Sequence, residues 1–512
     1  MFKKNKVAIS VVTGILGLAG VMTSAQAVHV NQDGTGQVLL FPYYNANDGY
    51  VTNVNLVNST DQTKAVKIRF REGKSSNDVL DFNIYMSPED IWTGSVKAGD
   101  DGKGNMVGTL STSDRTCTLP ALASCADGKC QAEVPFTGHN LYKGVTAADT
   151  REGYIEVIEM GVVEDTAVKA GVLHKNGAPT DCKTIEAAWT PSTSGGKGTF
   201  SQGAGTAAAG VSAPTGGLFG SSAIVNVGKG SAYALDPVAI DNYTTQAQHY
   251  LSHDPDNFLL PSLASGNVAS SSVMTKTSTG ENEMVVTQWT AQKDACLEDK
   301  DELTPQCGTN PYPIAHVLLA PHLMNEYFLD PTDGYDGHTD WVVTFPMKKH
   351  GINAATTDVV ATFENGIFDR EEGRAGWVAS SGTSFGFSPP IGMGNVKVDD
   401  SSLLNREVNV ISFKSSDPSY DASRTLLSSD SKQSVSVGAF VSGWARLSFP
   451  GYSLSSGFQS AQGYSAKPST YTADSNVYKG VPATGAAFLE GNVSANPNAR
   501  FGDALPYKVQ RD

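Results

Sequence analysis

Positive charge is scarce in this 512-residue chain, which carries 37 lysines and arginines against 52 aspartates and glutamates, for a formal net charge of −15. The basic residues are scattered along the sequence. A protein that binds nucleic acid needs a local basic stripe, because phosphate contacts supply much of the affinity. We therefore expect no nucleic-acid partner.

Long apolar runs are missing after residue 27, so we expect no transmembrane segment in the mature chain. The run at 7–22 follows three lysines and precedes the small-residue pattern Ala25-Gln26-Ala27. It is shorter than the roughly 20 apolar residues that span a bilayer. Residues 1–27 therefore have the features of a cleaved secretory signal peptide. They predict an exported protein, at the cell surface, associated with the outer membrane, in the periplasm or released.

Hydrolase signatures are incomplete. Ser384 lies in a G-x-S-x-G pattern, which requires a strand before the serine and a helix after it, but Pro389 and Pro390 stop such a helix. Glu371 and Glu372 are adjacent acids, and nothing in the sequence places either one across a cleft from a second carboxylate. A secreted hydrolase is the least favoured class of function.

Metal-protease and nucleotide-binding patterns are also incomplete. His249 and His253 are spaced for one helical turn, but the glutamate of the zinc-protease motif is absent between them. The glycine-rich stretch 195–199 lacks the upstream glycine of a phosphate-binding loop. We therefore predict a protein that is not an enzyme.

Cysteine is rare but even in number. Six cysteines after an export signal indicate three disulfides rather than free thiols. We pair Cys296 with Cys307. The other four admit three pairings, and we favour one bridge within 117–130 and a second from that cluster to Cys182. The six are Cys117, Cys125, Cys130, Cys182, Cys296 and Cys307.

Alternation of apolar and polar residues is frequent. In 65–71, three apolar residues alternate with Lys67, Arg69 and Arg71, which predicts a strand with one face in a core and one in water. Similar segments separated by Gly, Asn, Asp and Ser recur at 50–56, 80–86, 154–160, 314–320, 341–346, 358–364, 407–413 and 434–449. This spacing predicts an all-β fold of antiparallel, immunoglobulin-like β-sandwich domains with long Gly/Ser/Thr-rich loops.

The composition also suggests boundaries. We expect a signal peptide at 1–27, a β-sandwich domain at 28–170 and one or more larger β-rich domains at 215–512. The stretch between them, 171–214, is rich in Gly, Ala and Ser and is interpreted as a linker or insertion.

Four segments together resemble a known group of proteins. They are Gly36–Tyr44 (GQVLLFPYY), Arg71–Lys74 (REGK), Val79–Asn83 (VLDFN) and Thr339–Pro346 (TDWVVTFP). The chain resembles an uncharacterised family of exported and cell-surface proteins of Gram-negative bacteria. The resemblance implies a location in the envelope or at the surface. It brings no catalytic residues, because the family has no established activity.

One acidic stretch could bind a cation. Asp330, Asp333, Asp336 and Asp340 fall within eleven residues, and carboxylate oxygens are ligands that Ca²⁺ prefers. Their spacing differs from that of an EF-hand, and Asp and Gly also suit a turn before a strand. Calcium is the one cofactor that the sequence suggests.

The favoured function is a structural or adhesive protein of the cell surface or extracellular matrix. The extended segment before residue 45 could add a strand to a neighbouring copy, which would make self-association the expected contact. The alternative is that this segment is the first strand of its own sandwich. The residues proposed for the assembly strand are Val38, Leu39, Leu40 and Phe41.

A second candidate function is binding of a glycan or another small ligand. Loops of β-sandwiches often carry such sites, and aromatic rings stack on the faces of sugars. Packing in the core is the more usual role of such rings. The candidates are Tyr43, Tyr44, Trp92, Trp341 and Trp377.

Overall fold

The structure, a computed structural model, describes most of the chain from residue 27 to residue 511. The described part excludes 123, 127–128, 138–140, 142–143, 191–197, 203–208, 253–259, 277–278, 291–310, 332–335, 351–358, 364–365, 372, 375–401, 430–431, 451, 456–464, 469–476 and 493–499. The signal-peptide prediction therefore lies outside the described residues, as do Ser384, His253, Glu372 and the pair Cys296 and Cys307.

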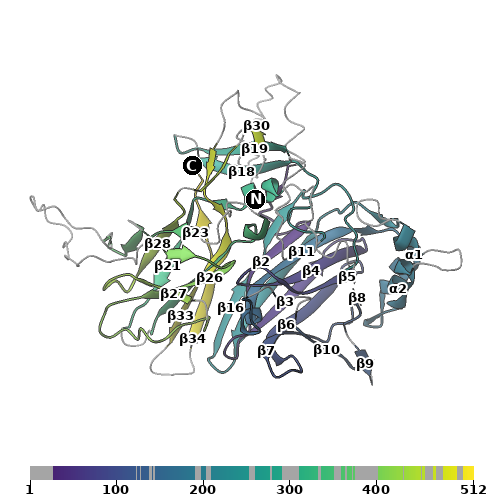
Figure 1. Cartoon of the computed structure of the whole chain (residues 1–512), viewed down its shortest axis with the longest axis horizontal. Helices are drawn as coiled ribbons and strands as arrows, with labels where there is room; N and C mark the ends of the chain where they lie inside the picture. Colours follow the sequence, from purple (N-terminus) through teal and green to yellow (C-terminus); the bar gives the residue numbers. More distant parts are fainter. Residues whose placement is uncertain are drawn as a thin grey trace, which may run out of the picture.

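The all-β prediction is confirmed, and the described strands form two sandwiches side by side with a small third sheet above them (Figure 1). The helices are short: α1 (Thr166–Val172), α2 (Lys183–Trp189) and α3 (Tyr312–Val317), with 3₁₀ turns at Ala148–Arg151, Thr199–Gln202 and Lys348–His350. No described helix has the length and apolar character needed to cross a membrane. The immunoglobulin-like form of the sandwiches stays a prediction.

The N-terminal sandwich packs two sheets face to face. The first has the order β1 (His29–Val30), β17 (Val238–Asp241), β2 (Val38–Asn45), β11 (Glu152–Val163), β4 (Lys64–Glu72), β5 (Asp78–Met86) and β8 (Cys117–Leu119), with β14 (Val211–Ser212) beside β11. The second has the order β16 (Ser231–Leu235), β15 (Leu218–Asn226), β3 (Val51–Asn58), β6 (Ile91–Asp100), β7 (Met106–Thr112), β10 (Lys129–Pro135) and β9 (Ser124–Ala126). Strands β15 and β17, which the sequence interpretation assigned to the second region, thus pair with strands of the first.

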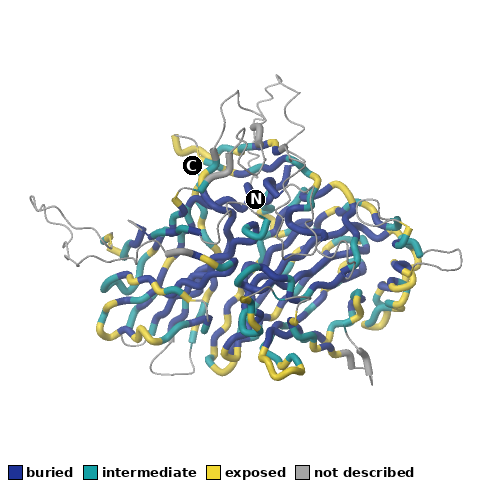
Figure 2. Tube along the Cα trace, viewed as in Figure 1, coloured by how far each residue is buried: buried dark blue, intermediate teal, exposed yellow. Residues whose placement is uncertain are grey.

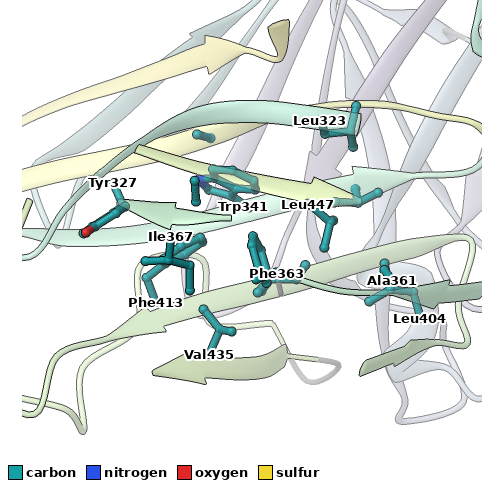
Figure 3. Packing of buried hydrophobic residues seen from close by; sticks show 14 of the residues in the cluster. Leu323, Tyr327, Trp341, Ala361, Phe363, Ile367, Leu404, Phe413, Val435 and Leu447 are labelled. Atoms are coloured by element: carbon teal, nitrogen blue, oxygen red, sulfur yellow. The ribbon is translucent and has the colours of Figure 1, made fainter. Parts of the chain in front are cut away.

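The C-terminal sandwich also has two sheets. One has the order β24 (Ile367–Asp369), β28 (Ser442–Ser448), β21 (His322–Phe328) and β35 (Lys508–Val509). The other has the order β27 (Lys432–Ser436), β26 (Val408–Lys414), β22 (His338–Thr344), β33 (Thr484–Asn492) and β34 (Arg500–Pro506). Between them lies an aromatic-rich core in which Trp341 packs against Phe363 and Phe413 (Figure 3). Described ladders are antiparallel except that of β26 with β27.

A three-stranded sheet of β18 (Ser270–Lys276), β19 (Asn282–Thr290) and β30 (Ser465–Pro468) sits above the two sandwiches (Figure 1). Four short strand pairs complete the described fold: β12 (His174–Lys175) with β13 (Ala178–Pro179), β20 (Leu319–Ala320) with β32 (Val481–Pro482), β23 (Val359–Ala361) with β25 (Ser402–Leu404), and β29 (Ser453–Ser455) with β31 (Val477–Lys479).

The prediction for 65–71 was half wrong. The strand forms as β4, and its apolar residues enter the core between the sheets, but its charged residues are buried as well (Figure 2). A segment from the chain after β17 covers this face: Ser252 accepts a hydrogen bond from Lys67 at 2.9 Å, and the carbonyl of Pro261 accepts one from Arg69 at 2.8 Å. The alternation of apolar and charged residues correctly predicted which side chains share a face of β4, but it did not show that another segment covers the charged face.

Each buried cation of β4 has an anionic partner. We call this set the charge ladder, and its pairs are Lys64–Glu159 at 2.6 Å, Lys67–Asp81 at 2.6 Å, Arg69–Asp78 at 2.6 Å, Arg69–Glu156 at 3.6 Å and Arg71–Glu156 at 2.8 Å. Desolvation opposes ionisation of Glu156, but Arg71 and Arg69 outweigh it and lower its pKa. The ladder is therefore a structural network of buried, paired charges.

One disulfide, Cys117–Cys182, joins β8 to the start of α2. It is one of the pairings favoured from the sequence. Backbone pairing places Cys125 of β9 opposite Cys130 of β10. The bridge between these two residues stays a prediction, as does Cys296–Cys307.

Candidate functional site

The aromatic residues proposed from the sequence for glycan binding do not reach the surface. Tyr43, Tyr44, Trp92 and Trp341 are at most 1% exposed, and Trp377 lies outside the described residues. Each of the four belongs to a hydrophobic core, so none of them can offer a ring face to a ligand. The described structure instead exposes a different group of aromatic side chains.

This group lies on the outer face of the C-terminal sandwich, across strands β24, β28 and β21. The backbone register places Trp444 of β28 directly beside Phe368 of β24 on one side and Glu326 of β21 on the other. Neighbouring residues on these strands, such as Ala445 and Ile367, point into the core. Strand pairing thus brings two rings and a carboxylate into one row on the outer face.

The two rings stack on each other. The centroids of Phe368 and Trp444 are 4.3 Å apart with an interplanar angle of 11°, and the guanidinium of Arg374 lies 5.1 Å from the Phe368 centroid. Trp444 is nevertheless 39% exposed. Beneath the row, the hydroxyl of Tyr327 donates a hydrogen bond to the carbonyl of Phe368 at 2.9 Å and fixes the backbone of β24. The result is a firmly positioned aromatic surface that still meets solvent.

The surface is hollowed on both sides of Glu326. One hollow of about 790 Å³ includes Phe368 and Trp444, and a second of about 510 Å³ includes Phe501 of β34. Glu326, Phe328 and Leu489 line both hollows, so the two form one trough. We call it the aromatic trough.

Polar groups surround the rings of the aromatic trough. Asp369 and Arg370 line the first hollow, and Asp330 and Asp503 line the second. Flat aromatic faces flanked by carboxylates and guanidiniums suit a ligand that has both apolar C–H faces and hydroxyl groups.

Glu371, a proposed acid of a glycosidase, is exposed next to this surface, and its carboxylate lies 3.9 Å from Arg370 on the same turn. Its described surroundings are those of a solvated surface acid. Its proposed partner, Glu372, lies outside the described residues.

The proposed calcium ligands are only partly described. Asp340 is buried in β22, where its carboxylate accepts hydrogen bonds from Ser412 at 2.6 Å and from the amides of Leu426 and Leu427. Asp336 contacts Arg424 and accepts a hydrogen bond from His338 at 2.9 Å. Protein donors thus already surround these two carboxylates.

Asp330 is partly exposed and lines the aromatic trough, and Asp333 lies outside the described residues. Within the described ranges, no three or more His, Cys, Asp or Glu side chains gather as a metal site. Calcium binding by this stretch stays a prediction.

His249 is a buried core residue. Its Nε2 atom lies 2.9 Å from the hydroxyl of Tyr85, which also accepts a hydrogen bond from Trp189. Burial lowers the pKa of His249 to about 3, so the imidazole is neutral at physiological pH. The described environment is aromatic and does not resemble a zinc site.

The proposed assembly strand is an internal strand. Residues 38–41 lie in β2, which pairs with β11 on one edge and with β17 on the other. All four side chains are at most 1% exposed. This is the arrangement that the alternative interpretation, a first strand of its own sandwich, describes, and residues 38–40 are paired on both edges.

Sequence reasoning missed the aromatic trough. One signal was present. In 442–448, Trp444 and Arg446 alternate with Ala445 and Leu447, so the tryptophan lies on the same face of the strand as the arginine and not on the apolar face. Phe368 and Phe501 carried no comparable signal, because strand pairing and the meeting of two sheets place them at the trough.

Comparisons with known proteins add no further assignment: no protein-family model, curated protein or solved structure matches this chain.

Proposed function

We propose that this chain is an exported, non-catalytic protein of the cell surface or extracellular space that binds glycans through the aromatic trough. The observation that carries the proposal is the stacked pair of Phe368 and the solvent-exposed Trp444 beside Glu326. Large exposed aromatic surfaces on a folded protein commonly mark sites of recognition. The adjacent carboxylates supply acceptors for sugar hydroxyls.

The proposal keeps the adhesive role expected from the sequence but replaces strand addition with glycan binding as the way in which the protein adheres. Strand addition through 38–41 would need a free edge, and residues 38–40 are already paired within the chain on both edges. A trough on the outer face of the C-terminal sandwich requires no rearrangement of the fold. Adhesion through glycans is therefore the form of the hypothesis that fits the described residues best.

The test is a titration of the mature protein with a panel of neutral and acidic oligosaccharides, in which binding is measured by isothermal titration calorimetry and by tryptophan fluorescence. We expect at least one sugar to bind and Trp444→Ala to weaken it at least tenfold, because stacking would lose its central ring. Phe219→Ala is the matched control, since Phe219 is a similarly exposed ring, at 40%, on the N-terminal sandwich. No binding by any sugar, or equal loss in both variants, would overturn the proposal.

A further inference from the structure

A third hollow lies where the three-stranded sheet meets the two sandwiches. Its volume is about 400 Å³, within the range of small-molecule sites. The walls come from β1, β17, β18, β19, β33, β35 and the end of α3. Much of the lining is aliphatic: Val30, Val238, Val273, Leu318, Leu323 and Val509. We call it the junction cavity.

One wall is built by alternate residues of the C-terminal segment. Tyr507, Val509 and Arg511 all line the junction cavity, as the period of two in an extended chain requires. Lys508, which lies between them in the sequence, is exposed. The cavity wall therefore has a phenol at one position, an aliphatic side chain in the middle and a guanidinium four residues after the phenol.

The guanidinium at the end of this wall is partly buried and has no ion-pair partner among the described residues. Arg511 donates hydrogen bonds from Nε to the carbonyl of Leu319 and from Nη2 to that of Val317, both at 2.9 Å. Among the described residues no carboxylate lies within ion-pair distance of it. Burial lowers the pKa of Arg511, which reflects the loss of solvent around the charge. A buried cation normally has a counter-ion, as each cation of the charge ladder has.

The hydroxyl of Tyr507 is also unsatisfied. It is buried and has no hydrogen-bond partner among the described residues, while its ring packs against Trp341 with centroids 5.2 Å apart. A buried polar atom without a partner is unfavourable and calls for an explanation. The cavity thus has an aliphatic body and, along one wall, a hydroxyl without a described hydrogen-bond partner and a guanidinium whose described hydrogen bonds go to backbone carbonyls.

We propose that the junction cavity binds a medium-chain monocarboxylate, with the carboxylate at Arg511 and the aliphatic chain along Val509 toward Tyr507. The distance along an extended strand from residue 507 to residue 511 is about 13 Å, which suits a chain such as that of decanoate. Exposed Met274 and Met284 line the cavity as well and offer flexible apolar contacts to the chain.

The test is a calorimetric titration of the mature protein with decanoate and with decanol, both below their aggregation concentrations. We expect decanoate to bind and Arg511→Gln to weaken it at least tenfold, while the affinity for decanol changes less than twofold. Arg511→Lys, which keeps the charge, should restore part of the loss. Lys508→Gln is the matched control, because it removes a neighbouring exposed charge outside the cavity.

Two further variants locate the site. Val273→Trp should fill the cavity and abolish binding of both ligands, and thermal unfolding checks that this variant folds. Trp444→Ala should leave decanoate binding unchanged, which separates this site from the aromatic trough. Absence of decanoate binding to the wild-type protein, or equal binding by wild type, Arg511→Gln and Val273→Trp, would overturn the proposal.

Discussion

The outer faces of the two sandwiches differ in a way that reverses the usual expectation. On the N-terminal sandwich the outer face of β4 carries lysine and arginine, yet these side chains are at most 1% exposed. On the C-terminal sandwich the outer face of β28 carries Trp444, which is exposed. Alternation along a strand therefore establishes which residues share a face, and the rest of the chain decides whether that face meets water.

The largest effect should come from breaking the charge ladder. Glu156→Gln would remove the anion that lies 2.8 Å from Arg71 and 3.6 Å from Arg69, and would leave buried cations undercompensated. We expect the free energy of unfolding to fall by about 3 to 5 kcal/mol. Urea denaturation monitored by tryptophan fluorescence measures the change.

The matched control for this variant is Glu326→Gln on the exposed outer face of β21. We expect its effect on the free energy of unfolding to stay within about 0.5 kcal/mol. Equal losses in the two variants would contradict the contrast between a covered and an open face.

A smaller effect should come from a buried acid outside the ladder. Burial raises the pKa of Glu407 to about 7, with Lys348 opposing the shift and Glu72 adding to it. The folded state thus keeps a proton that the unfolded state releases above a pH of about 4.3, so this carboxyl's contribution to stability falls as the pH rises from there to about 7.

Glu407→Gln should therefore stabilise the protein at pH 8 by on the order of 2 kcal/mol and have little effect at pH 5. Urea denaturation at both pH values gives the comparison, with the exposed Glu133→Gln as the control. A difference in stability from wild type that is the same at both pH values would show that Glu407 does not titrate between them and would contradict a pKa of about 7.

A still smaller effect than that of Glu407 should come from the exposed ring of Trp444. Trp444→Ser removes a side chain that is partly in water, so we expect the free energy of unfolding to change by about 1 kcal/mol or less. Thermal unfolding checks this expectation. A loss above about 2 kcal/mol would identify Trp444 as part of the core and would remove the contrast between the two outer faces.

Strands were the most predictable feature of the molecule. Segments such as 65–71 and 80–86 alternate clearly, and they form β4 and β5. Their apolar residues, including Ile68 and Phe82, meet in one core. A strand can be predicted from its local sequence, because successive side chains of a strand point to opposite faces and the sequence alternates with the same period of two residues.

The cover over β4 and the aromatic trough were not predictable in the same way. Ser252 and Pro261 reach Lys67 and Arg69 from nearly two hundred residues away in the sequence, and no local pattern encodes that contact. The residue type alone was misleading as well. Positions 92 and 444 are both tryptophan, yet Trp92 is buried in a core and Trp444 is exposed, because the surroundings of their strands differ.

The position of β2 between β11 and β17 has a consequence for how the molecule folds. His29 of β1 pairs with Asp241 of β17, and β17 pairs in turn with β2, so the first sheet joins the start of the chain to residues more than two hundred positions later. Pairings of such high contact order form slowly. During synthesis the edges of the early strands stay unpaired until residue 241 has emerged from the ribosome. A chaperone that binds these edges during that interval would protect the nascent chain from aggregation.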